Sequence, residues 1–148
     1  MRVTSNIEPM AYLIERNDHS INCTVTICAN IVSSTNNING KDTMVVYTYD
    51  KYTLTEHYRA NLEVDIKSNF DAWVAKGSNK EKQSESDKIR SYRNKLLNDC
   101  DLKYCNSEKW NNMNKQKQKQ WVEYKIALRD ITAQDGFPYK VVWPKIPD

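Results

Sequence analysis

Glycine is scarce in this chain of 148 residues, which contains only three. A phosphate-binding loop of the form G-x-x-x-x-G-K-[ST] needs glycines close together, so the sequence excludes this class of nucleotide site. No stretch approaches the ~20 apolar residues of a membrane-spanning helix, and the first residues lack the continuous apolar core of a signal peptide. We therefore expect a soluble protein that is made and kept in a cytoplasm and has no membrane partner.

Histidine is rarer still, with two residues in the chain. Acid–base or nucleophilic catalysis needs a base held against a nucleophile, and neither His19 nor His57 stands in a recognisable catalytic pattern. Carboxylates are scattered among Lys and Arg, which is typical of solvated faces and singles out no glycosidase pair. The chain is also too short for a TIM barrel of ~250 residues. The sequence predicts a protein that is not an enzyme and uses no cofactor.

Four cysteines form two pairs, Cys23/Cys28 and Cys100/Cys105, with four residues between the members of each pair. This spacing falls within the range found in zinc sites. However, the residues around the first pair alternate like a strand, which puts Cys23 and Cys28 on opposite faces. Disulfides are rare in a reducing compartment. We therefore expect buried or incidental thiols and no metal site.

The charge balance is nearly even, with 22 Lys and Arg against 19 Asp and Glu and a formal net charge of +3. The densest basic segment is residues 115–119, where lysines alternate with glutamines. Residues two apart on a helix do not share a face, so these lysines fan around the axis instead of forming a stripe. We expect a solvated helix start here. A host-directed regulatory or nucleic-acid-binding protein is an alternative that rests on this segment alone.

The first third of the sequence is typical of β-structure. Three runs rich in β-branched and aromatic residues predict strands over residues 10–16, 20–31 and 43–49. The polar residues 33–42 predict a loop. In the second run, alternation predicts that one set of side chains faces the core: Ile21, Cys23, Val25 and Ile27.

A long amphipathic helix is predicted over residues 54–76, because apolar residues recur there every three or four positions. Gly77 stands where a helix commonly ends. Residues 78–87 contain no apolar side chain and predict a polar linker that acts as a hinge or flexible loop. We therefore expect an α+β fold, in which residues 1–77 form a small antiparallel β-rich part covered by this helix.

The second domain, residues 88–148, is predicted to be a small helical module with an extended Pro-rich tail. Helical periodicity covers residues 89–97 and 116–131, and the segment 98–112 between them is expected to be irregular. One side of the second helix is apolar, with two further aliphatic residues beside it: Trp121, Tyr124, Leu128 and Ile131, then Val122 and Ile126. The apolar tail has no partner strand, so it must lie along the preceding helices or dock on another chain.

Two motifs in this domain follow a combined pattern. The first, R-x-x-R-N-x-L-L, begins at Arg90 and ends at Leu97. The second, W-x-x-Y-x-x-x-L-R-D-I-x-x-Q-x-G-F-P-x-x-V-x-W-P-x-x-P, runs from Trp121 to Pro147. Over about residues 88–148 the chain resembles the C-terminal module of caudoviral tail fibre assembly proteins, the phage tail assembly chaperones.

The resemblance implies a helper that binds a phage tail fibre or another tail or virion protein, without covalent chemistry, in the host cytoplasm during assembly or on the virion. Self-association is left open. A permanent virion component, such as a tail, baseplate, fibre or decoration protein, is the alternative within phage biology. The side chains expected in the module core or at a protein partner are Trp121, Tyr124, Leu128, Phe137, Pro138, Trp143 and Pro144. Those expected to form internal ion pairs and hydrogen bonds are Arg90, Arg93, Arg129, Asp130 and Gln134.

Overall fold

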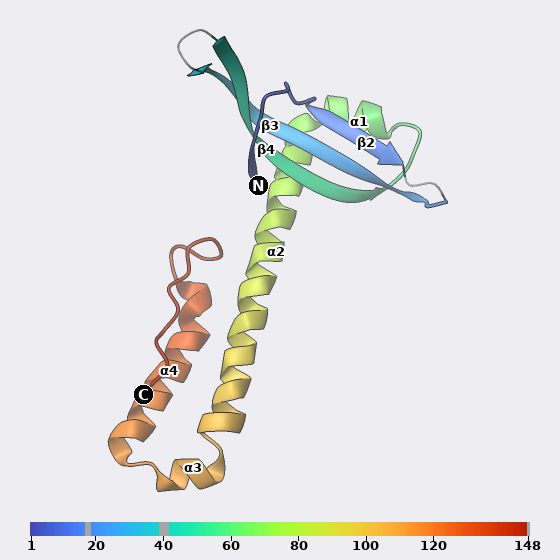
Figure 1. The fold of residues 1–148 in the computed structure, drawn as a ribbon. Helices are drawn as coiled ribbons and strands as arrows, with labels where there is room; N and C mark the ends of the chain where they lie inside the picture. The colour runs from blue at the N-terminus through green and yellow to red at the C-terminus, as the bar shows by residue number, and fades with distance from the viewer. Residues whose placement is uncertain (17–18, 39–41, 148) are drawn as a thin grey trace. The chain divides into compact units, whose positions relative to one another are not determined.

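The computed structural model describes residues 1–16, 19–38 and 42–147. The chain divides into two units, Met1–Glu81 and Lys82–Asp148, and each has a hydrophobic core. The units contain an antiparallel sheet and several helices, so the predicted α+β class is confirmed (Figure 1). Within the described ranges, no helix combines the length and the apolar content that crossing a bilayer requires.

The first unit is built on a four-stranded antiparallel sheet in the order β1-β4-β3-β2. Its strands are β1 (Arg2–Ser5), β2 (Tyr12–Arg16), β3 (Asn22–Ile38) and β4 (Asp42–His57). Alternation in β3 places Cys23, Val25 and Ile27 on one face, where all three are fully buried, as predicted. The prediction for Ile21 is wrong. Its side chain is 72% exposed because it precedes β3 and lies beyond the last pair that β3 forms with β2.

Strands β3 and β4 form a longer hairpin than the sequence predicts. Residues 33–38, predicted as part of a loop, continue β3, and β4 begins at Asp42; the rest of that predicted loop, residues 39–41, lies outside the described ranges. A register shift between Ala29 and Val32 interrupts the hairpin. Beyond the shift, no described side chain belongs to the core, so polar Ser, Thr and Asn residues are compatible with strand pairing there.

The helix predicted over residues 54–76 begins later than expected and is divided. Helix α1 spans Leu62–Ser68 and helix α2 spans Phe70–Asp99. Leu54 belongs to β4, where it pairs with Val25 and its side chain is buried in the core. The start of the predicted helix is therefore wrong, because pairing with a distant strand outweighs a local spacing that is also compatible with a helix.

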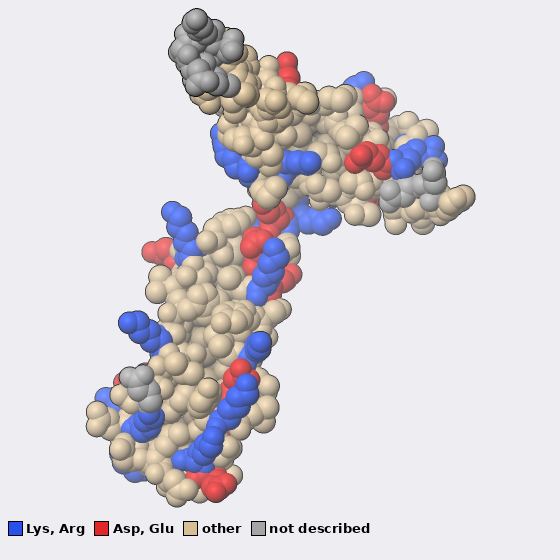
Figure 2. All heavy atoms as spheres, viewed as in Figure 1, with Lys and Arg blue, Asp and Glu red and all other residues tan. Residues whose placement is uncertain are grey.

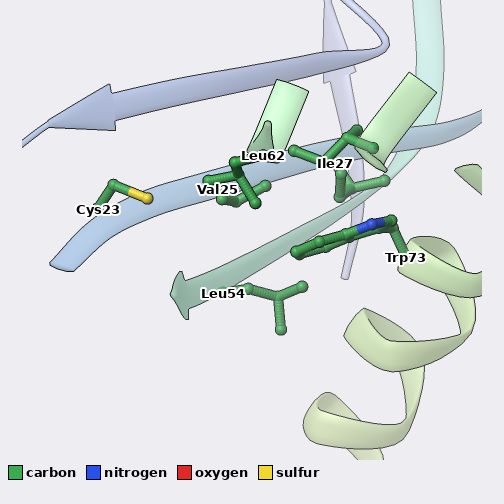
Figure 3. Packing of buried hydrophobic residues seen from close by; sticks show 7 residues of the cluster. Cys23, Val25, Ile27, Leu54, Leu62 and Trp73 are labelled. Atoms are coloured by element: carbon green, nitrogen blue, oxygen red, sulfur yellow. The ribbon is translucent and has the colours of Figure 1, made fainter. Parts of the chain in front are cut away.

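Side chains from the sheet and from both helices meet in the core of the first unit (Figure 3). Val25 and Leu54 come from the paired strands, and Leu62 and Trp73 pack against them from α1 and α2. The helices thus cover one face of the sheet, as the amphipathic pattern predicts.

Gly77 does not end a helix but lies buried inside α2. A Cβ atom at this position would lie 2.5 Å from the Cβ of Tyr52 in β4. The missing side chain therefore allows α2 to approach the sheet closely, and this packing outweighs the low helix propensity of glycine.

Residues 78–87 are helical within α2, so the flexible linker predicted here is wrong. The division between the two units nevertheless falls inside this segment. Its Lys, Glu, Gln and Ser residues tolerate a helix well, and charged pairs one turn apart support it, including Lys88 and Glu85 with an N–O distance of 2.6 Å. The lack of apolar residues marks an exposed helix here and not a loop.

The second unit is helical. After α2 come the π-helix η1 (Cys100–Tyr104), α3 (Ser107–Asn112), α4 (Lys115–Arg129) and the 3₁₀-helix η2 (Asp130–Ala133). The helix predicted over residues 116–131 is thus confirmed, whereas residues 89–97 belong to α2 and residues 98–112 are largely helical. Side-chain oxygens of Asn106 and Asn114 accept backbone N–H bonds at the starts of α3 and α4, which explains where these helices begin.

Candidate protein-binding surface

The apolar face of α4 forms the core of the second unit. Trp121, Tyr124 and Leu128 recur every three or four residues and are buried in one cluster. The Tyr104 ring stacks on Trp121 with the ring centroids 4.9 Å apart, and Tyr124 meets Trp121 edge to face at 5.8 Å. Three of the predicted site residues therefore act as core anchors, which leaves them little surface for a partner.

The segment after η2 packs on helices of its own unit. The Trp143 ring meets Tyr92 of α2 edge to face, with the centroids 4.8 Å apart. The Arg90 guanidinium lies 5.5 Å from the centre of the Phe137 ring. Among the predicted site residues of this segment, one is buried and three are half-buried: Pro138, then Phe137, Trp143 and Pro144.

Gln134 holds the same segment by a pair of hydrogen bonds. Its Nε2 donates to the backbone oxygen of Val142, and the Val142 N–H donates to its Oε1, both at 2.8 Å. One side chain thus satisfies both backbone groups of a residue that has no helix or strand partner. Gln134 therefore fixes the returning segment to the end of η2, in line with the hydrogen-bonding role expected for it.

We expect Gln134→Ala to loosen this segment, because it leaves both backbone groups of Val142 to water. The loss should be about 1–2 kcal/mol of unfolding free energy in the second unit. Amide hydrogen exchange at Val142 should accelerate while exchange at Leu128 changes much less. Gln116→Ala, at an exposed position on α4, is the matched control. Equal exchange at Val142 in both variants would contradict the role of Gln134.

The two arginines on α2 make local hydrogen bonds. Arg90 Nη1 donates to the Ser86 hydroxyl at 2.6 Å, and Arg93 donates to the Asn94 side-chain oxygen from Nε at 3.1 Å and from Nη2 at 2.9 Å. These bonds lie within α2 and do not link two helices. Of these two arginines, Arg90 also contacts another segment within the described ranges, through the Phe137 ring.

Arg129 and Asp130 lie at the end of α4 and are exposed. Neither side chain forms a hydrogen bond or ion pair with any residue in the described part of the chain, so the internal pairing expected for them is not found. Because they follow Leu128 on the helix, they point away from the core that it enters. Their charges are therefore available at the surface.

A second face of α4, opposite the buried one, carries a line of exposed residues that we call the outer stripe. Its members are Lys115, Lys119, Val122, Ile126 and Arg129. They are spaced by four, three, four and three residues, which places them on one side of a helix. Val122 is 47% exposed and Ile126 is 49% exposed. The outer stripe therefore combines two aliphatic side chains with a basic residue beyond each end of the pair.

An open groove of about 380 Å³ lies between α4 and the end of the chain. Gln120, Glu123 and Tyr124 line it from α4, and residues 144–147 form its other wall. Burial raises the pKa of the Tyr124 phenol, so its hydroxyl stays protonated at neutral pH. The groove marks the boundary between α4 and the returning segment.

The cysteines are free thiols. Cys23, Cys28 and Cys100 are buried, as predicted, and Cys105 is half-buried. Burial raises the pKa of the Cys28, Cys100 and Cys105 thiols, which disfavours the reactive thiolate. Among the described residues, no three His, Cys, Asp or Glu side chains come together in the way a metal site requires.

Basic residues do not gather into one patch on the face shown in Figure 2, where Lys and Arg side chains are separated by neutral surface or lie beside Asp and Glu. Lys119 is 3.8 Å from Glu123 on α4, with both side chains exposed, and such pairs are weak in water. The predicted basic segment at residues 115–119 is thus the solvated start of a helix.

Comparison with known proteins identifies one family. The model of the phage tail assembly chaperone protein family matches residues 86–148, which include the end of α2, α3, α4 and the returning segment. No curated protein and no solved structure matches the chain. The match leaves residues 1–85 outside it and coincides closely with the second unit. Residues 86–148 therefore carry the phage tail assembly chaperone module, as their sequence motifs predict.

Proposed function

We propose that this protein is a phage tail assembly chaperone that binds a tail protein non-covalently in the host cytoplasm, and that it performs no covalent chemistry. A tail fibre protein is the first candidate for the partner. The observation that carries the proposal is the family match over residues 86–148. This module buries its own hydrophobic core and also exposes apolar side chains that do not belong to that core. The exposed large aliphatic residues of this module are Leu102, Val122, Ile126, Val142 and Ile146.

Binding at this surface would draw its energy from apolar burial, which contributes ~25 cal/mol for each Å² removed from water, before the entropy cost of association is subtracted. A moderate net affinity suits a helper that must release its partner when the tail is complete.

Deleting the gene from the phage that encodes it tests this function. We expect infected cells to accumulate defective or incomplete tails, visible by electron microscopy, and the wild-type gene supplied in trans to restore them. Normal tails after deletion would overturn the proposal.

Mass spectrometry of purified virions separates the chaperone from a permanent component. A chaperone is absent from mature particles or present far below stoichiometric amounts. A fixed stoichiometric copy number in the particle would overturn the chaperone and favour a virion structural protein that carries the same module.

A further inference from the structure

We propose that the outer stripe of α4 is the docking site for an amphipathic helix whose apolar ridge is flanked by acidic side chains. This inference rests on the proposed function and specifies the chemistry of the tail partner. It does not involve the buried face of α4, which belongs to the module core.

The geometry of the outer stripe fits a helix. Val122 and Ile126 lie one turn apart and form a short apolar ridge along α4. A partner helix with an apolar residue every three or four positions has a groove between its rows of side chains. The ridge on α4 can pack into this groove, because helices pack with the ridges of one in the grooves of the other. The exposed ridge is thus complementary to an amphipathic helix.

The net charge of the second unit indicates which charged residues the partner helix carries beside its apolar ridge. Residues 82–148 contain 14 Lys and Arg against nine Asp and Glu, a formal charge of +5, whereas residues 1–81 contain eight against ten, a charge of −2. On the outer stripe, Lys119 and Arg129 lie on either side of the aliphatic pair, and Lys119 also forms a weak, exposed pair with Glu123 at 3.8 Å. Arg129 makes no ion pair with a described residue. An acidic residue on the partner near each end of the ridge would find a basic one opposite.

The same charges disfavour a second copy of this chain as the occupant. If two outer stripes pair antiparallel with Val122 opposite Ile126, Lys119 of one copy lies opposite Arg129 of the other. If they pair in parallel, each cation faces its own equivalent. Both arrangements oppose like charges across the contact.

Nucleic acid is also disfavoured by the composition of the outer stripe. Phosphates are bound by clustered cations, whereas the centre of the outer stripe is aliphatic. A protein helix uses both the apolar centre and the basic ends.

Binding of designed peptides to the full chain tests the proposal. The probe is a fluorescein-labelled 21-residue peptide of Leu, Ala and Glu, with Leu on one helical face and Glu beside it. Two controls are a peptide with Lys in place of Glu and a peptide of the same composition as the probe in scrambled order. We expect fluorescence anisotropy to show saturable binding of the probe, and binding at least about tenfold weaker for both controls. Equal binding of either control would overturn the proposal.

Charge-reversal variants place the interaction on the outer stripe. We expect Arg129→Glu and Lys119→Glu each to weaken binding of the acidic probe about tenfold, and Val122→Asp to weaken it at least as much. Lys95→Glu makes the same charge change at an exposed position on α2 and should have little effect. Circular dichroism verifies that each variant stays folded. Loss of binding in Lys95→Glu equal to that in Arg129→Glu would overturn the assignment to the outer stripe.

Two further measurements decide between this partner and the others. Tighter binding of a 20-base-pair DNA duplex than of the acidic probe would overturn the proposal, as would a dimer in analytical ultracentrifugation that Val122→Asp dissociates. In the phage, we expect Arg129→Glu to reproduce the deletion defect. Normal tails with Arg129→Glu, together with defective tails after deletion, would reject this docking site and leave the proposed function intact.

Discussion

Replacing Trp121 by alanine is expected to lower the unfolding free energy of the second unit by about 3–5 kcal/mol. The Trp121 side chain is 2% exposed and contacts the rings of both Tyr104 and Tyr124, so its loss leaves a large cavity at the centre of the core. Amide hydrogen exchange at Leu128 and Ile131, which belong to the same core, measures the effect.

Val122→Ala is the matched control for this variant. Val122 is the next residue on the same helix and half of its side chain is exposed, so the change should cost less than about 1 kcal/mol. If Trp121→Ala were as mild as Val122→Ala, Trp121 would belong to a binding surface and not to the core.

Replacing Ile66 by alanine is expected to destabilise the first unit by about 2–5 kcal/mol. Helix α1 has only seven residues, and its buried side chains are Leu62 and Ile66. Losing one of them removes much of what holds the helix on the sheet, because so short a helix is not stable alone. Amide exchange at Val25 and Ile27 in β3 reports the change.

Val64→Ala provides the control on the same helix. Val64 is also β-branched but is 64% exposed, so its truncation should change stability by less than about 0.5 kcal/mol. Comparable losses from Ile66→Ala and Val64→Ala would show that α1 does not pack on the sheet as described.

Local periodicity predicts much of the fold. The alternation of Cys23, Val25 and Ile27 places the buried face of β3, and the spacing of Trp121, Tyr124 and Leu128 places α4 and its core face. In both places, the side chains that local periodicity puts on one face of the element are also the ones buried in the core. A short stretch of sequence is therefore enough to predict which face is buried.

The errors arise where a distant segment decides the structure. Leu54 has helical spacing to the residues after it, yet pairing with Val25 makes it part of a strand. Gly77 has the signal of a helix end, yet the approach of Tyr52 explains why glycine stands inside a helix. Residues 78–87 lack apolar side chains, and polarity alone does not distinguish an exposed helix from a loop.

The candidate surface shows a similar limit. The sequence motif identifies the module, but it contains both core residues and surface residues and does not distinguish them. From the sequence, Arg129 and Asp130 are expected to form internal ion pairs. Only the structure shows that no described residue pairs with them. Val122 and Ile126 stand beside the core in the helical pattern, and the structure places them outside it. The rest of the unit determines which face of α4 is buried, and local periodicity carries no information about these long-range contacts.

The packing of the C-terminal segment on its own module supports the whole account, because it determines which apolar residues stay exposed. Nuclear Overhauser effects between the aromatic protons of Tyr92 and Trp143 test this packing most directly, since the two ring centroids lie 4.8 Å apart. We predict strong cross-peaks between these rings in the isolated protein. Their absence, with the signals of residues 137–147 at random-coil positions, would contradict the account.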